Sequence, residues 1–227
     1  MDFLSWEAWS AVRLSFQVGL CAVLVILPPA IAVGYLLARW QSPHKWLLEV
    51  LVNLPLVLPP VVTGYLLLIV FAPRGPLGSA LENWLGVRIV FTWLGAAIAA
   101  AVMSFPLMVR AIRLAFQGVD PRLEMAARSL GASRFDAFVS VALPLARSGV
   151  LAGCVLAFAR SLGEFGATIM VAGNIVGETQ TLPLAIFSDF NLPDADVEVG
   201  RLAGISIALA AGALLVSEWL ERRHTRA

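Results

Sequence analysis

The sequence predicts an all-α integral membrane protein, with about five transmembrane helices in a single domain. Of its 227 residues, 59% are hydrophobic and only 14% are charged, and the mean hydropathy is +0.85. A soluble domain of this length would carry far more charge. Long stretches without Asp, Glu, Lys or Arg recur along the chain, and a helix of about 20 apolar residues crosses the hydrocarbon core of a bilayer.

Three stretches contain no charged residue, namely 14–38, 50–73 and 89–109. A fourth, 148–173, is interrupted by Arg160 and Glu164, and a fifth, 202–217, is short but is extended by Trp219 at an expected membrane interface. We therefore expect spans at residues 12–38, 49–72, 89–114, 147–173 and 201–220, all within one domain of residues 1–227.

The basic residues lie in alternate connections and predict the orientation. The connection before the second expected span carries Arg39 and Lys45, and residues 110–147 carry six arginines against three acidic residues. The C-terminal tail carries three arginines, whereas residues 174–201 carry five acidic residues and one arginine. The positive-inside rule places basic segments in the cytoplasm. We expect a cytoplasmic loop at 116–146, an external loop at 174–200, an external N-terminus and a cytoplasmic C-terminus.

Motifs of catalysis and nucleotide binding are missing from the sequence. There is no G-x-x-x-x-G-K-[ST] segment, and the single lysine, Lys45, follows no glycine-rich loop. His44 and His224 lie outside the expected spans, and no H-E-x-x-H or C-x-x-C pattern suggests zinc. The sequence predicts no enzyme, no metal site and no cofactor on this chain, so uphill transport would draw its energy from a partner or an ion gradient.

The connection between the third and fourth spans predicts two short helices joined by a glycine. Asp120-Pro121 is typical of a helix start, and Leu123, Ala126, Ala127 and Leu130 follow at the spacing of one helical face. Gly131 is placed to end this helix in a left-handed conformation. We call residues 120–142 the elbow.

The second helix of the elbow is predicted to begin at Ser133, with Asp136 completing a capping box. Phe135, Phe138 and Val139 then share one face, and Leu143-Pro144 is expected to end the helix before the fourth span. A basic surface with apolar residues suits contact with anionic lipid and also docking of a soluble partner. The residues alone leave both interpretations open.

The elbow also carries a family resemblance. Met125-Ala-Ala-Arg-Ser-Leu-Gly131, followed by Leu143-Pro144, resembles the E-A-A-x-x-x-G…L-P loop of type I ABC-transporter permeases. The motif glutamate falls at Met125 here, and Glu124 is displaced by one position. Because one residue turns a helical side chain by about 100°, we do not assign the role of that glutamate to Glu124.

Further stretches look like the molybdate/tungstate permease subfamily, namely residues 54–65, 103–113, 158–168 and 177–183. The resemblance implies a type I ABC importer permease fold in a bacterial cytoplasmic (inner) membrane. It implies a homodimer with two cytoplasmic ABC ATPase subunits, which bind ATP and Mg, and an external oxyanion-binding protein. It favours docking of the elbow on the ATPase over lipid contact. The residues it assigns to ATPase coupling are Ala126, Ala127, Gly131, Ala132, Ser133, Phe135, Leu143 and Pro144.

Candidates for the translocation pathway come from two interrupted spans. Arg160 and Glu164 are the charges inside the fourth span, where each is costly without a partner. They are either a structural pair or a gate, and the small residues Ser161 and Gly163 beside them favour close packing or line a pore. In the second span, Asn53, Pro59 and Pro60 mark a helix that prolines must kink or unwind.

Outside the membrane, residues 182–187 predict a short helix, and the acidic run that follows suits a protein contact better than an oxyanion site. The predicted function is a permease subunit that imports molybdate or tungstate, coupled to a separate ATPase through the loop around Gly131. A permease for another oxyanion such as sulfate is the alternative. An ion-coupled secondary carrier or channel would need more titratable groups along its path and usually an internal repeat, and a membrane scaffold that only recruits a partner is a third interpretation. Nothing suggests nucleic-acid binding.

Overall fold

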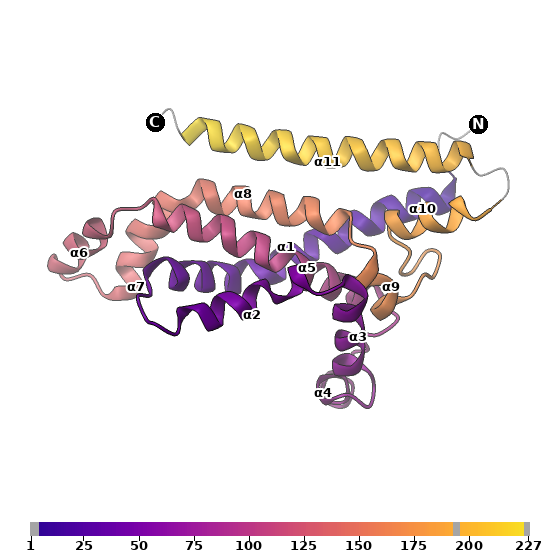
Figure 1. Ribbon diagram of the computed structural model, residues 1–227, viewed down its shortest axis with the longest axis horizontal. Coiled ribbons are helices and arrows are strands. Elements are labelled where there is room, and N and C mark those ends of the chain that lie inside the picture. The colour runs from indigo at the N-terminus through magenta and orange to yellow at the C-terminus, as the bar shows by residue number, and fades with distance from the viewer. Residues whose placement is uncertain (1–4, 193–195, 225–227) are drawn as a thin grey trace.

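Helices dominate the structure, a computed structural model that describes residues 5–192 and 196–224, and no strand occurs within those ranges (Figure 1). The helices are α1 (Trp6–Arg39), α2 (Lys45–Val57), α3 (Pro60–Phe71), α4 (Pro76–Leu85), α5 (Trp93–Gln117), α6 (Pro121–Ser129), α7 (Arg134–Ala137), the π-helical turn η1 (Phe138–Ala142), α8 (Leu143–Leu162), α9 (Gly166–Ala172), α10 (Leu182–Phe190) and α11 (Asp196–His224). The all-α prediction is confirmed.

The core lies where α1, α5 and α8 pack side by side, with α11 against α8. Small residues bring these helices close together. A Cβ atom added at Gly34 of α1 would lie 2.7 Å from Ile112 of α5, and one at Gly149 of α8 would lie 2.3 Å from the Cβ of Ala115. Helices in membranes gain much of their association from such close packing, because lipid is as apolar as the side chains.

Four described helices or helical stretches are long and apolar enough to cross a membrane, and a fifth span exists if α2 and α3 are counted together. The chain bends by 108° between α2 and α3, so residues 49–72 are not one straight helix. Pro59 and Pro60 lack the N–H groups that would continue the α2 ladder. The expected break in this span is confirmed, and its sharp angle is an addition from the structure.

The fourth span differs from its predicted bounds at both ends. Leu143-Pro144 does not end the preceding helix, because α7, η1 and α8 form one continuous helix over Arg134–Leu162. In η1 the N–H of Leu143 donates to the carbonyl of Phe138, five residues back. This wider turn leaves room for the ring of Pro144. At the other end the helix stops at Leu162, not at 173, and α9 follows as a separate short helix.

Exposed tryptophans mark both ends of the bundle. Trp9 lies near the start of α1, Trp40 and Trp46 lie just past its end, and Trp219 lies near the end of α11; all are at least one-third exposed. The 34 residues of α1 extend about 51 Å at 1.5 Å per residue. Tryptophan prefers the membrane interface. The length of α1 and the tryptophans at its two ends therefore indicate that it reaches from one interface to the other.

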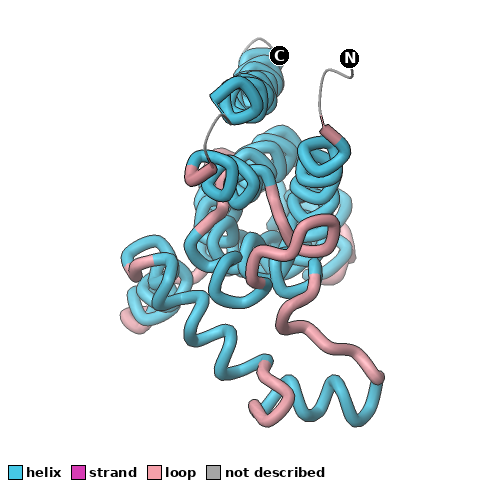
Figure 2. The backbone as a smooth tube through the Cα atoms, turned by 90° about the vertical axis from the view of Figure 1, so that its right-hand side faces the viewer, coloured by secondary structure: helices cyan, strands magenta, loops and turns pink. Residues whose placement is uncertain are grey.

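The two ends of the bundle carry different elements (Figure 1). The elbow lies at one end, beside the end of α1, whereas α10 and the beginning of α1 lie at the other. The arm formed by α3 and α4 leaves the bundle on the side opposite to α11, and Figure 2 shows the same arrangement after a 90° turn. Helix α4 was not expected from the sequence.

Gly64 sets the contact between the arm and the bundle, and its replacement is a test of the fold. A Cβ atom at Gly64 would lie 2.8 Å from the backbone of Ala167 in α9, so Gly64→Ala should push α3 from α9 and cost roughly 1–3 kcal/mol of unfolding free energy. We expect a thermal unfolding midpoint several degrees lower in detergent. Gly200→Ala is the control, since a Cβ there meets nothing within 4 Å. Equal midpoints for the two variants would contradict the packing described.

Candidate functional site

The predicted helix caps and glycine turn of the elbow are confirmed. The side chain of Asp120 accepts a hydrogen bond from the N–H of Arg122 and caps α6. Gly131 follows α6 with φ of 101°, a backbone conformation that side chains other than glycine rarely adopt. Ser133 and Asp136 form a reciprocal capping box at the start of α7. The short-range residues therefore determine the shape of this turn.

The elbow presents apolar side chains that no described part of this chain covers. Leu130 is 91% exposed, Phe135 72%, Met125 54% and Leu123 48%. Ala126 is also exposed and Ala127 is half-buried, so the predicted face of α6 points away from the bundle. An apolar surface of this kind on a basic segment requires a partner of some sort, whether protein or lipid.

Phe138 does not lie on this surface, contrary to the prediction that it shares a face with Phe135. Its ring packs edge-on against Tyr35 at the end of α1, with centroids 4.8 Å apart, and lies 5.9 Å from the ring of Phe116. A half-buried cage of aromatic rings thus holds η1 against the bundle, and Phe135 remains outside it.

Glu124, to which the motif assigns no role because of its register, is the buried residue of α6. Its carboxylate accepts hydrogen bonds from Arg39 and Tyr35 of α1, both at 2.6 Å. The two partners lie 85 and 89 positions away in the chain, so no local pattern reveals the contact. The sequence offers one weak signal, a single glutamate in an arginine-rich segment, and that signal does not identify a distant partner.

Arg160 and Glu164 form the predicted ion pair, with 2.8 Å between Nη2 and Oε2. They do not lie in the middle of a straight span, because α8 ends at Leu162 and the pair straddles that end. Glu164 is 3% exposed and also accepts a hydrogen bond from the N–H of Ala167, at the start of α9. This cap replaces the helical hydrogen bond that the break removes.

The residues around the pair divide into packed and open positions. Ser161 is buried, and its hydroxyl lies 3.4 Å from that of Ser104 in α5 and donates to the carbonyl of Ala157. A Cβ atom at Gly166 would lie 2.7 Å from Pro60, so this glycine serves close packing. In contrast, a Cβ at Gly163 would meet nothing within 4 Å.

The structure therefore brings the two broken spans together, since Pro60 begins α3 where Gly166 begins α9. Pro59 precedes α3 as its exposed N-cap. Asn53 lies earlier in the chain, within α2, and its side-chain oxygen accepts a hydrogen bond from Arg110 of α5 at 3.0 Å. The elbow, with the residues predicted to contact an ATPase, lies at the end of the bundle away from these breaks (Figure 1).

At the opposite end, α10 confirms the short helix that the sequence predicts. Burial raises the pKa of Asp189 above its usual range, and the negative charges of Glu198 and Glu7 raise it further. A region that already disfavours one carboxylate also disfavours a dianion. Asp194 of the predicted acidic run lies outside the described residues.

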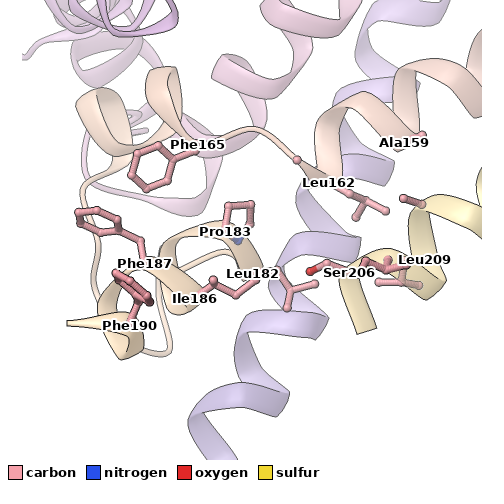
Figure 3. A pocket seen from close by; sticks show the side chains of 13 residues that line it. Ala159, Leu162, Phe165, Leu182, Pro183, Ile186, Phe187, Phe190, Ser206 and Leu209 are labelled. Atoms are coloured by element: carbon pink, nitrogen blue, oxygen red, sulfur yellow. The ribbon is translucent and has the colours of Figure 1, made fainter. Parts of the chain in front are cut away.

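A hollow of about 620 Å³ lies between α10, the end of α8 and α11 (Figure 3). Its walls are Phe165, Phe187, Phe190, Ile186 and other apolar side chains, and the hydroxyl of Ser206 already donates to the carbonyl of Leu202. Among the described residues no charged side chain lines it, so it does not suit an oxyanion. Within residues 5–192 and 196–224, no cluster of three His, Cys, Asp or Glu side chains could hold a metal ion.

Comparison with known proteins gives one family. The family model of binding-protein-dependent transport system inner membrane components matches residues 30–223. The molybdenum transport system permease protein ModB of Escherichia coli is 55% identical over 214 residues, which are 94% of this chain and 93% of that protein. The sulfate transport system permease protein CysT of the same species is 38% identical over 186 residues, 81% of this chain and 65% of that protein.

A solved bacterial alginate ABC transporter, in complex with an alginate pentasaccharide-bound periplasmic protein, has the same fold. It aligns with a TM-score of 0.69 at 18% identity and covers 99% of this chain and 80% of that one. The fold likeness covers the bundle and the elbow together. This chain belongs to the family of binding-protein-dependent transport system inner membrane components.

Proposed function

We propose that this chain is the permease subunit of an ATP-driven importer that carries molybdate or tungstate across the bacterial inner membrane. The observation that supports this proposal most directly is the elbow, a glycine turn with exposed apolar residues at the arginine-rich end of a helical membrane protein. The choice of cargo rests on a relative that is 55% identical over nearly the whole chain and is named for molybdenum transport. Molybdate and tungstate share charge and shape, so both belong to the proposal.

The elbow supports a cytoplasmic ATPase as its partner. Leu130 and Phe135 are exposed anchors of the size that fills a groove in a protein partner. Arg122, Arg128 and Arg134 are exposed on the same segment and make it positively charged. In this proposal one ATPase subunit docks on each elbow and binds ATP and Mg, and this chain binds no cofactor and catalyses no reaction of its own.

The broken spans support a pathway between two copies of the chain. Pro59, Val61 and Tyr65 around the start of α3 are exposed, so this part of the arm is not covered by its own bundle. Irregular backbone at membrane depth requires protein or water around it. A second copy that faces this region would cover it with protein and could enclose a water-filled pathway. The Arg160–Glu164 pair lies beside this region.

The orientation follows from charge in this proposal. Arg39, Arg122 and Arg128 lie at the elbow end, which the positive-inside rule places in the cytoplasm. The start of α1 and α10 then face outward and meet the external binding protein, and the end of α11 lies inside. Anionic headgroups would touch the rim of the elbow without filling its role as the ATPase contact.

The experiment is uptake by a reconstituted complex. The chain would be purified with its ATPase, placed in liposomes that contain ATP and Mg, and supplied with binding protein and labelled molybdate, tungstate or sulfate. We expect ATP-dependent uptake of molybdate and tungstate that requires the binding protein. Uptake of sulfate in preference to molybdate and tungstate would identify the chain as a sulfate permease. Uptake without ATP would support an ion-coupled carrier instead.

A further inference from the structure

Tyr35, Arg39 and Glu124 form a compact cluster where the elbow joins the bundle, and we call it the root cluster. Tyr35 and Arg39 lie one turn apart at the end of α1, and Glu124 lies in the first turn of α6. Arg39 Nη2 lies 2.6 Å from Glu124 Oε1, Arg39 Nε lies 3.0 Å from the same oxygen, and the hydroxyl of Tyr35 donates to Oε2 at 2.6 Å. Both carboxylate oxygens are therefore held.

The root cluster also holds the chain on both sides of α6. Arg39 Nη2 donates to the carbonyl of Val119 at 3.0 Å, just before the residue that caps α6. The ring of Tyr35 packs against Phe116 at 5.2 Å between centroids and against Phe138 at 4.8 Å. The last turn of α1 thus contacts the end of α5, the start of α6 and η1.

Partial burial gives these contacts their strength. The side chains of Arg39 and Glu124 are 20% and 12% exposed, whereas the Arg88–Glu82 pair has exposures of 72% and 29%. Hydrogen bonds between charged groups strengthen as water is excluded, while exposed pairs contribute little. Glu124 is also the one side chain of α6 that turns inward, so it anchors a helix that is otherwise exposed.

We infer that the root cluster is the positioning device through which movement of the elbow reaches α1. This inference rests on the proposed function, in which an ATPase moves the elbow. The elbow joins α5 through a short turn at 118–120, and at its other end α7 and η1 continue into α8 as one helix. The Arg39–Glu124 contact joins α6 directly to α1. Because α1 packs on both α5 and α8, a displacement of α6 reaches the core through α1 without passing through either covalent connection.

The test uses Glu124→Gln in the complete complex with its ATPase and binding protein. We expect the ATPase subunits to co-purify as with the original chain, because the outward face of the elbow is unchanged. The stimulation of ATP hydrolysis by loaded binding protein and the cargo imported per ATP should each fall by roughly 10-fold to 100-fold, as expected from loss of charged hydrogen bonds. Tyr35→Phe should lower both by only a few fold.

A charge exchange tests the contact itself. The double variant Arg39→Glu with Glu124→Arg restores an ion pair at the same place, so it should recover part of the coupling that Glu124→Gln loses. Glu82→Gln is the matched control, since it removes a carboxylate from a pair of similar length, 2.7 Å, in a different part of the chain. It should leave the coupling ratio unchanged.

Two outcomes overturn the inference. Normal cargo per ATP in Glu124→Gln would show that the elbow moves α1 without this contact. A lower membrane abundance with unchanged transport per molecule would reduce Glu124 to a stabilising residue. Failure of the original chain to retain an ATPase would contradict the proposed function and the inference together. The first two outcomes contradict the inference alone, so the two kinds of failure are distinguishable.

Discussion

Gly131→Asp should abolish ATP-coupled uptake while the chain still inserts into the membrane. Gly131 has φ of 101°, and a Cβ atom there would meet nothing within 4 Å. An aspartate therefore causes no clash within this chain, but it strains the turn by about 1–3 kcal/mol. It also adds a charged side chain at the tip that the ATPase must approach. We expect uptake to fall roughly 30-fold or more, as for a central interface residue.

Gly86→Asp is the matched control for this prediction. Gly86 ends α4 with φ of 64°, and a Cβ there also meets nothing within 4 Å. The substitution thus adds the same side chain to another left-handed glycine, far from the elbow. Retention of the ATPase on affinity-purified chain, uptake by liposomes and membrane abundance would be measured for both variants. Coupled uptake by Gly131→Asp at the level of Gly86→Asp would contradict docking through this turn.

The contrast between Gly131 and Glu124 shows how far the sequence predicts this site. Asp120, Gly131 and the Ser133–Asp136 box act within four residues, so their patterns predict caps and turn correctly. Glu124 depends on Arg39 and Tyr35, which fold against it from the far end of α1. The register of a motif locates the outward face of a helix, whereas the inward face depends on tertiary packing that local spacing does not describe.

The two broken spans show a similar limit. Pro59 and Pro60 remove two adjacent backbone donors and favour a break in the second span. Pro28 and Pro29 do the same inside the unbroken helix α1, so a proline pair alone does not decide where a helix breaks. The break after Leu162 has no proline. There the side chain of Glu164 accepts a hydrogen bond from the N–H of Ala167 and replaces part of the helical hydrogen bonding. The same sequence would suit a continuous apolar helix, and only contacts such as Gly166 against Pro60 decide otherwise.

Glu164→Gln should impair opening or closing of the pathway rather than folding alone. A glutamine oxygen can still accept from the N–H of Ala167, so the cap of α9 survives, but Arg160 loses its charged partner. Removing one member of a buried pair is typically costly, by about 3–5 kcal/mol, because the other charge is left uncompensated. Arg160 is 29% exposed, so the cost here should be smaller. We expect transport per molecule to fall roughly 10-fold or more.

A second variant separates gating from stability. Arg160→Met combined with Glu164→Gln leaves no orphan charge, and apolar replacement of an ion pair often restores stability. If the pair only fastens α8 to its neighbours, the double variant should recover both thermal stability and transport per molecule. If the pair acts in gating, the double variant should regain stability yet remain slow in uptake. We expect the second result, because the pair lies where α8 ends and α9 begins, and α9 packs against α3 of the arm.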